Sequence, residues 1–293
     1  MSNVIECKNL THYYGERCIY ENLNFTVQKG RVTGLLGKNG TGKTTTINIM
    51  NGYLQPKSGN CFLLGEPSHN LSPETKQRIG LLIEGHVQYS FFDIEQIEKF
   101  YSAFYPKWKK EPYYELMSKL KVAPKQKISK MSCGQRSQVA LGLILAQDPE
   151  LLILDDFSMG LDPGYRMLFV DYLREYVKAE NKSVFITSHI IQDLEHLVDD
   201  CLILDYGKVL LHKPTSDLLT KFKRYRFKAP KNFKIQNEQF YNTELIKGMI
   251  ETYSFLNKKE VLNYIKDLYP EIETIDEYKL TLEEAFIGLT GKY

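Results

Sequence analysis

The spacing of apolar positions predicts most of the secondary structure in the first two hundred residues. Short apolar runs, and short stretches that alternate apolar and polar positions between turn residues, are typical of strands. Such stretches lie at 4–10, 19–27, 32–36, 60–64, 79–83, 151–154 and 183–187, and a hairpin over 201–211 turns at 205–207. The continuous apolar run at 32–36 predicts a buried strand.

A helical period replaces the strand pattern between residue 93 and about residue 120. Apolar positions share one helix face until Pro106 interrupts them, and they resume at Tyr113. Further helices are predicted at 45–50, 165–179 and 190–197. Strands that alternate with helices indicate a mainly parallel sheet covered by helices. The stretch from 93 to about 120 is a helical insert, and the helical subdomain as a whole spans about 86–148.

The chain changes character after residues 214–221, which form the exit from the first domain. The remaining strands are predicted at 225–227, 249–255 and 272–278, and the remaining helices at 258–268 and 281–289. We therefore predict two domains, 1–220 and 221–293, of which the second is a small α+β domain.

Composition narrows the class of protein without identifying it. With 293 residues, of which 43% are hydrophobic and 25% charged, the chain resembles an ordinary soluble protein, and its net charge of +2 argues neither for nor against binding of nucleic acid. Its five scattered cysteines predict free thiols in a reducing compartment. No apolar run approaches the ~20 residues needed to span a bilayer. We expect a cytoplasmic protein that works at a membrane only if another chain supplies the spanning helices.

Residues 37–44 read Gly-Lys-Asn-Gly-Thr-Gly-Lys-Thr, a complete phosphate-binding loop. The loop lies between a predicted strand and a predicted helix, the context that separates a real phosphate loop from a glycine-rich turn. Its glycines let backbone N–H groups wrap phosphates, and the helix start adds its positive end. We expect Lys43 to reach the β- and γ-phosphates of ATP, and Thr44 to ligate Mg²⁺. The candidate nucleotide ligands are Gly37, Asn39, Gly40, Thr41, Gly42, Lys43, Thr44 and Thr45.

A second carboxylate motif follows the strand at 151–154. An apolar strand that ends in an acid places a carboxylate near Mg²⁺ in phosphate-loop enzymes. Asp155 suits that position, through a bound water, and the alternative is an Asp-containing turn. The phosphate loop upstream favours the magnesium interpretation.

Four further motifs follow one another in an order that matches a known family of ATPases. The segment Met131-Ser132-Cys133-Gly134-Gln135 resembles the signature of ATP-binding cassette (ABC) ATPases, and Gly160-Leu161-Asp162 resembles their D-loop. His189 resembles their switch histidine, and Tyr14 resembles the aromatic residue that stacks on adenine. For His189 and Tyr14 the alternatives are a surface histidine and ordinary packing. The match in order and spacing covers residues 1–215.

This resemblance implies an α/β fold: a mainly parallel sheet core, an antiparallel β subdomain, a helical subdomain and a small C-terminal accessory domain. It also implies that two cassettes pack head to tail around two ATP molecules. Ser132, Gly134 and Gln135 would meet the γ-phosphate bound by the partner cassette, and Asp162 would lie at the same interface. His189 and Lys43 would act on the γ-phosphate from the loop-bearing chain.

Three residues depart from the family pattern. Asp156 stands where the family places a glutamate general base, so the side chain is one methylene shorter and its reach changes by about 1.5 Å. Glu84 stands where the family places a glutamine that contacts Mg²⁺ and connects the ATP site to the transport partner. Glu84 is therefore a candidate catalytic and metal-binding residue. Cys133 stands where glycine is usual. The first departure predicts slow but real hydrolysis with Asp156 as the base.

The chain end at 280–291 resembles the tail of exporter cassettes of the ABC-2 type. The resemblance implies the ATPase subunit of an exporter, peripheral on the inner face of the cell membrane, with an integral membrane permease and a second ABC subunit, identical or different, as partners. The expected docking surface spans about residues 84–115 and includes His86, Tyr89, Phe91 and Phe92.

The sequence leaves other functions open. They are a nucleotide-gated ABC protein that hydrolyses slowly or not at all, an ABC ATPase that acts on ribosomes or nucleic acid, and an importer ATPase. Basic and aromatic residues interleave over 221–234, which predicts a half-buried strand, or else a surface for single-stranded nucleic acid or anionic lipid. No nucleic acid is expected as a partner, and the cargo cannot be inferred from this chain.

Overall fold

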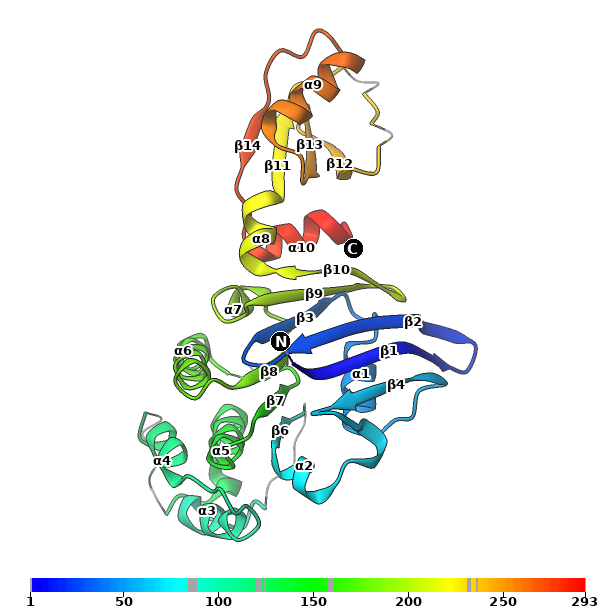
Figure 1. The fold of residues 1–293 in the computed structure, drawn as a ribbon. Helices are drawn as coiled ribbons and strands as arrows, with labels where there is room; N and C mark the ends of the chain where they lie inside the picture. The colour runs from blue at the N-terminus through cyan, green and yellow to red at the C-terminus, as the bar shows by residue number, and fades with distance from the viewer. Residues whose placement is uncertain are drawn as a thin grey trace. The chain divides into compact units, whose positions relative to one another are not determined.

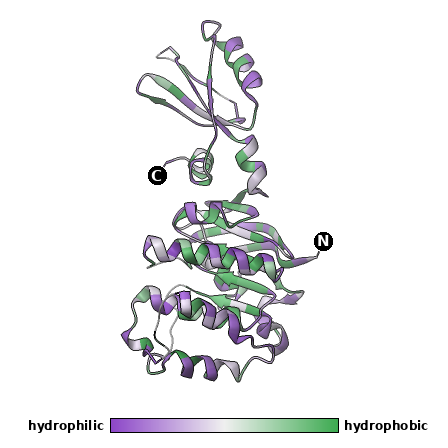
Figure 2. Ribbon diagram, turned by 90° about the vertical axis from the view of Figure 1, so that its left-hand side faces the viewer, coloured by the Kyte–Doolittle hydropathy of each residue, from purple (hydrophilic) through white to green (hydrophobic). Residues whose placement is uncertain are grey.

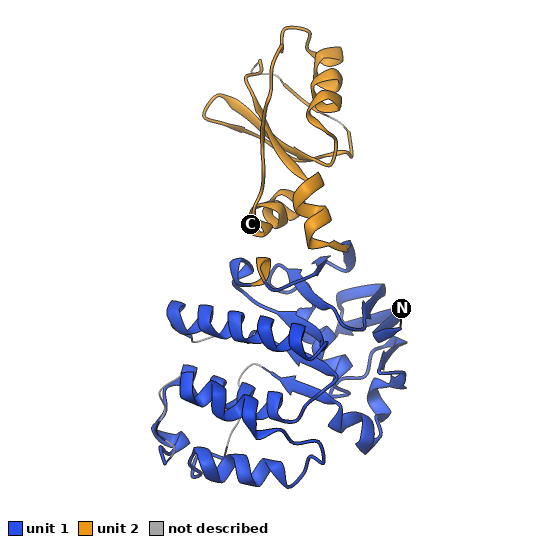
Figure 3. Ribbon diagram, turned by 60° about the vertical axis from the view of Figure 1, so that its left-hand side comes forward, with its two compact units in different colours: residues 1–193, 197–212 blue, residues 194–196, 213–293 orange. Residues whose placement is uncertain are grey.

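The computed structural model describes residues 2–83, 89–119, 123, 125–157, 161–230, 233–235 and 237–292. The chain divides into two compact units (Figure 3), one of residues 1–193 and 197–212, the other of residues 194–196 and 213–293. Helix α8 (Thr215–Lys221), which the sequence assigns to the first domain, belongs to the second unit.

The first unit is built on a six-stranded sheet with the order β10-β9-β3-β8-β7-β6. Its strands are β3 (Val32–Gly37), β6 (Ile79–Leu82), β7 (Leu151–Leu154), β8 (Ser183–Thr187), β9 (Asp200–Asp205) and β10 (Lys208–Pro214). The pairs β6–β7, β7–β8, β8–β3 and β3–β9 are parallel. The carboxyl ends of β3, β8 and β7 therefore meet at one edge of the sheet, where α/β proteins bind ligands.

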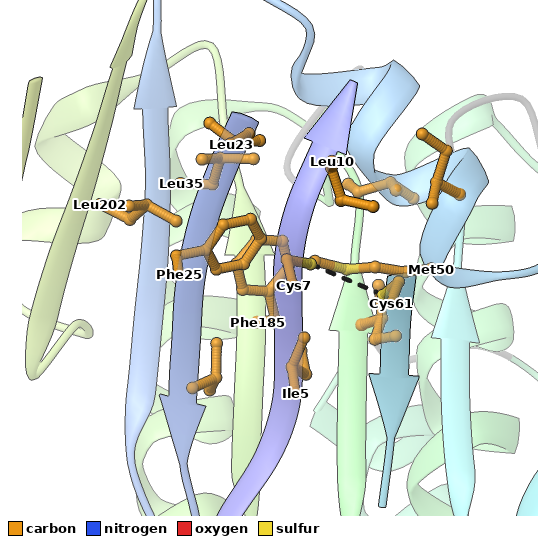
Figure 4. Packing of buried hydrophobic residues seen from close by; sticks show 14 of the residues in the cluster. Ile5, Cys7, Leu10, Leu23, Phe25, Leu35, Met50, Cys61, Phe185 and Leu202 are labelled. Atoms are coloured by element: carbon orange, nitrogen blue, oxygen red, sulfur yellow. Dashed lines mark hydrogen bonds between the residues drawn. The ribbon is translucent and has the colours of Figure 1, made fainter. Parts of the chain in front are cut away.

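An antiparallel sheet packs against this core and has the order β2-β1-β4-β5. It consists of β1 (Asn3–Tyr14), β2 (Arg17–Gln28), β4 (Ser58–Leu63) and the short β5 (Glu66–Pro67). Apolar side chains of β1, β2 and β4 share one buried cluster with helix α1 (Lys43–Met50) and with the central strands (Figure 4). This cluster fixes the helix that follows the phosphate loop.

The cysteines are free, as the sequence predicts. Cys7 and Cys61 face each other in this cluster, with their sulfur atoms 3.5 Å apart (Figure 4). Burial raises the pKa of the Cys7 thiol, so it stays protonated.

Helices α5 (Cys133–Ala146) and α6 (Pro163–Ala179) lie together on one side of the six-stranded sheet (Figure 1), whose strands are largely hydrophobic (Figure 2). Helix α3 (Ile94–Ser102) begins at a capping box between Asp93 and Gln96, and α4 (Lys110–Lys119) follows it. The predicted interruption near Pro106 is therefore confirmed. The remaining connections contain short helices, namely η1 (Ser68–Asn70), α2 (Pro73–Gln77), η2 (Ile128–Lys130) and α7 (Ile191–Glu195).

The second unit holds a four-stranded sheet with the order β12-β13-β11-β14. Its elements are β11 (Lys223–Phe227), β12 (Phe240–Ile246), β13 (Met249–Ser254), α9 (Lys258–Leu268), β14 (Asp276–Tyr278) and α10 (Leu282–Thr290). The strand predicted at 272–278 covers only Asp276–Tyr278, and β12 was not predicted. In β11, Tyr225 and Phe227 are buried while Arg224 and Arg226 are half-buried, which confirms the half-buried strand.

None of the helices within the described ranges is long and apolar enough to cross a membrane.

The close fit of β6 against its neighbours can be tested with two glycine substitutions. A Cβ at Gly80 would lie 2.6 Å from Ile144 and 3.0 Å from Pro149, whereas a Cβ at Gly164 would meet nothing within 4 Å. We expect Gly80→Ala to lower the free energy of unfolding by about 1–3 kcal/mol through overpacking. Gly164→Ala should leave it unchanged or raise it by about 0.4–1 kcal/mol. Urea unfolding measures both, and equal midpoints would contradict the prediction.

Candidate nucleotide site

The phosphate loop connects β3 to α1 in a conformation that requires glycine. Gly40 and Gly42 have φ angles of 80° and 99°, in the left-handed region. A Cβ at Gly42 would also lie 2.7 Å from Ile19 and 2.9 Å from Tyr20. Strand β2 therefore packs directly beneath the loop and allows no side chain there.

The side chain of Lys43 folds back and binds carbonyl oxygens of the loop itself. Its ammonium group donates hydrogen bonds to the carbonyl oxygens of Gly37 at 2.7 Å and Lys38 at 3.2 Å. The Thr41 hydroxyl donates to the same Lys38 carbonyl at 2.8 Å. Burial lowers the pKa of Lys43, and the carboxylates of Asp155 and Asp156 oppose that shift. The loop thus holds a cation at its centre with the first turn of a helix beside it.

Asp155 follows β7 and is buried, with 6% of its surface exposed. Its Oδ1 accepts a hydrogen bond of 2.6 Å from the hydroxyl of Thr187, the last residue of β8. The same hydroxyl accepts a bond of 2.9 Å from the backbone N–H of Asp156. One threonine therefore contacts both consecutive acids.

Asp156 and His189 lie against each other. The backbone N–H of His189 donates to Oδ1 of Asp156 at 3.1 Å, and Nε2 of the imidazole lies 3.1 Å from Oδ2. The Asp156 side chain is almost completely buried, and the His189 side chain is 55% exposed. Asp156 has a φ of 48°, an uncommon conformation for a residue with a side chain.

Tyr14 and Arg17 lie beside the phosphate loop. The Tyr14 ring is half exposed, and its hydroxyl lies 3.5 Å from that of Thr45. Nη2 of Arg17 is 3.5 Å from the carbonyl oxygen of Gly40. Thr44 and Asn39 are exposed at the same loop. An exposed aromatic ring near a phosphate loop can stack on a base.

The signature residues form a separate cluster at the start of α5. The Ser132 hydroxyl accepts from the N–H of Gln135 at 3.1 Å, and the Gln135 side chain accepts from the N–H of Ser132 at 3.0 Å. Cys133 is exposed, and Gly134 is half-buried. Among the hydrogen bonds of the described residues, none joins this turn to the phosphate loop. Asp162 precedes α6, exposed and without a side-chain bond to the helix end.

Part of the predicted site lies outside the described residues. Glu84 and His86 fall in the gap 84–88, and Gly160 falls in the gap 158–160. In the parts that the structure describes, no group of three or more His, Cys, Asp or Glu residues could hold a metal ion by itself.

Residues 20–158 match the family model for ABC transporters. The bacitracin transport ATP-binding protein BcrA of Bacillus licheniformis is 31% identical over 305 residues, which span 99% of this chain and 98% of that protein. The chain belongs to the ABC transporter family.

Other relatives of this ABC protein carry export functions in their names. The Nod factor export ATP-binding protein I of Cupriavidus metallidurans is 29% identical, with 75% of this chain and 74% of that protein covered. Among solved structures, a dimeric ATP-binding cassette in a post-hydrolysis state with ADP and Pi has a TM-score of 0.62 at 20% identity, covering 72% of this chain and 98% of that chain. This likeness confirms the cassette fold, and the family identifies the chain as an ATP-binding ATPase subunit.

The sequence did not predict Thr187 or Arg17 as residues of this site. Thr187 was assigned only as the end of a strand, and its signal was a hydroxyl residue two positions before His189. Nothing in the sequence indicates that its hydroxyl meets two acids from another strand.

The steric requirement at the phosphate loop predicts different outcomes for two left-handed glycines. Gly42→Ala should destabilise the protein and weaken ATP binding at least about tenfold, because the Cβ overlaps Ile19 and Tyr20. Gly65 has a φ of 90°, and a Cβ at this position would meet nothing within 4 Å. Gly65→Ala should therefore cost only about 1–2 kcal/mol of backbone strain and leave ATP binding unchanged. Titration with a fluorescent ATP analogue distinguishes them, and equal affinities of the two variants would contradict the prediction.

Proposed function

We propose that this ABC protein is the energy-supplying subunit of an exporter, which binds ATP with Mg²⁺, pairs with a second ABC subunit and drives a separate membrane permease. One observation carries the proposal. The phosphate loop, Asp155, Asp156 and His189 are brought together at one sheet edge, whereas the Ser132 turn forms no bond to them among the described residues. This separation supports a nucleotide that is bound by the loop of one chain and meets the signature turn of a second chain. The names of the relatives, bacitracin transport and Nod factor export, favour export.

The described residues suit ATP as the substrate. The N–H groups of residues 37–45 and the ammonium of Lys43 would bind its phosphates, and Tyr14 would stack on its base. From the partner copy, Ser132, Gly134 and Gln135 would approach the γ-phosphate at a helix start, where negative charge is favoured, with Asp162 nearby.

The donor set also fits Mg²⁺, which prefers hydroxyl, carboxylate and water oxygens. The Thr44 hydroxyl and the buried Asp155 carboxylate would hold the ion, and Glu84 is proposed as a further contact. When bound, the ion neutralises charge on the phosphate oxygens. Thr187 orients one oxygen of Asp155 through the 2.6 Å hydrogen bond.

Asp156 is the proposed base that orients the attacking water, with His189 contacting the γ-phosphate. A displacement of about 1 Å in such a group can cost about a hundredfold in rate, so the shorter aspartate predicts slow turnover. A second candidate function is a nucleotide-gated subunit that scarcely hydrolyses. It is favoured by the engagement of the Asp156 carboxylate with His189.

Permease docking is proposed at the aromatic surface of the helical subdomain. Tyr89, Phe91 and Phe104 are 47%, 63% and 58% exposed, and their rings contact Phe92 and Phe100. Exposed aromatic patches of this kind mark interaction sites. Docking there would hold the subunit at the inner face of the membrane. The partner cassette can be a second copy or a different chain.

Substitutions of Asp156 test the function. We expect Asp156→Asn to reduce ATP turnover to background while a stable dimer accumulates with ATP and Mg²⁺, because binding remains and hydrolysis stops. Asp156→Glu should raise turnover above the natural protein by up to about a hundredfold. Phosphate release gives the rate, and light scattering gives the molecular mass.

Two outcomes separate the candidates. Turnover of the natural protein that does not exceed that of Asp156→Asn would favour the nucleotide-gated subunit. If Asp156→Asn also stays monomeric with ATP and Mg²⁺, pairing of identical chains is contradicted, and a different second cassette must be sought.

Cys133 offers a chemical test of the signature turn. Cys133 and Cys18 are exposed, whereas the other three cysteines are buried. Alkylation of Cys133 places bulk beside Ser132, so N-ethylmaleimide should block ATP turnover of the natural protein and of Cys18→Ala. Cys133→Ala should keep most of its activity after treatment. Equal sensitivity of Cys133→Ala would show that the reagent acts elsewhere.

A further inference from the structure

We propose that Thr187 is a positioning residue for ATP hydrolysis. Its single hydroxyl group would hold both Asp155 and Asp156 in the orientation that the reaction needs. The inference rests on the proposed function of Asp155 and Asp156. It adds a residue that lies on a different strand and contacts neither the phosphate loop nor the signature turn in the described hydrogen bonds.

The hydroxyl makes two hydrogen bonds in opposite senses. It donates to Oδ1 of Asp155 at 2.6 Å and accepts from the N–H of Asp156 at 2.9 Å. A hydroxyl can donate and accept at once, which a methyl group cannot do. Thr187 is 2% exposed, so water cannot readily replace either bond.

The location of Thr187 explains why one residue can serve both acids. Strand β8 lies between β3 and β7, and Thr187 is paired with Leu35 of β3. On the other side, Ile186 is paired with Leu154, the residue before Asp155. The end of β8 thus stands beside the end of β7, at the level where the phosphate loop departs.

The bond to the N–H of Asp156 holds a peptide in an uncommon conformation. Asp156 has a φ of 48°, and its carboxylate accepts from the N–H of His189. Such backbone persists only where its surroundings hold it. Without the Thr187 hydroxyl, the Asp156 N–H would lose its acceptor in a buried site, and the peptide between the two acids would be free to turn.

Loss of this hydroxyl should affect the chemical step more than nucleotide binding. The contacts that close the phosphate loop come from Gly37, Lys38, Thr41 and Lys43, and none involves Thr187. Nucleotide affinity without Mg²⁺ should therefore be preserved. The Mg²⁺ requirement should rise because Asp155 is less well oriented, and kcat should fall because Asp156 is displaced.

The test compares Thr187→Val with Thr187→Ser in the full chain. Valine keeps the shape of threonine and removes the hydroxyl, whereas serine keeps the hydroxyl. We expect Thr187→Val to lower kcat at least about tenfold and to raise the Mg²⁺ concentration for half-maximal nucleotide binding at least about threefold. Its affinity for a fluorescent ATP analogue without Mg²⁺ should stay within about twofold of the natural protein. Thr187→Ser should restore kcat and the Mg²⁺ dependence to within about threefold.

Thr33→Val is the matched control. Thr33 is a buried threonine of the neighbouring strand β3, and in the described structure its hydroxyl has no hydrogen-bond partner. This variant should retain kcat, Mg²⁺ dependence and thermal stability, which shows that a Thr-to-Val change in this sheet is tolerated. Thermal unfolding of all three variants identifies any that fail to fold.

The inference is overturned if Thr187→Val keeps kcat within about twofold of the natural protein, or if valine and serine lose kcat equally. Absence of turnover in the natural protein is instead a failure of the proposed hydrolysis. In that case the Mg²⁺ dependence of nucleotide binding decides about Thr187. An unchanged dependence in Thr187→Val overturns the inference, and a raised dependence rescued by serine supports it.

Discussion

The parallel pairing of β3, β8 and β7 is the constraint on which the nucleotide site depends. Leu35 is paired with Thr187, and Leu154 with Ile186, so the three strands end at nearly the same level. The phosphate loop, Thr187 and Asp155 therefore reach one edge of the sheet although they are far apart in sequence. A slip of one residue would turn every side chain of a strand to the opposite face. The buried strands β7 and β8 consist mainly of apolar residues, and their packing holds the register that the polar residues need.

Contacts within the chain hold the phosphate loop in a conformation that suits an anion. Its own carbonyl oxygens hold Lys43, and β2 packs beneath Gly42. Binding of an anion therefore requires little further ordering of the loop. The Ser132 turn is likewise fixed by its capping box with Gln135. On the proposed function, each chain presents two surfaces, the phosphate loop and the Ser132 turn, which share no hydrogen bond among the described residues. ATP would then join them across an interface, and hydrolysis would weaken the junction by removing the shared phosphate.

The sequence predicted the elements whose pattern is local and missed those that depend on tertiary contacts. The runs at 151–154 and 183–187 match β7 and β8 at both ends. Short apolar stretches bounded by polar residues are typical of the buried strands of a parallel sheet. The strand Phe240–Ile246 was missed because its Tyr-Asn-Thr-Glu centre is polar, as expected at a sheet edge. For the site, the glycine-rich loop and Asp155 were predictable from spacing. The contact of Thr187 with two acids was not, since it depends on which strands are neighbours.

The contacts of Asp156 with its neighbours indicate how an aspartate differs from the family's usual glutamate at this position. The carboxylate accepts from the N–H of His189, so its position is tied to the residue two positions beyond the end of β8. A glutamate at this position would carry its carboxylate about 1.5 Å farther from the backbone, so it could not accept the same hydrogen bond without a different side-chain conformation. The residue proposed to orient water and the residue proposed to contact the γ-phosphate therefore share one hydrogen bond. The imidazole Nε2 also lies 3.1 Å from Oδ2 of Asp156, so an imidazole that turned toward a bound nucleotide would release this second contact and leave the backbone hydrogen bond in place.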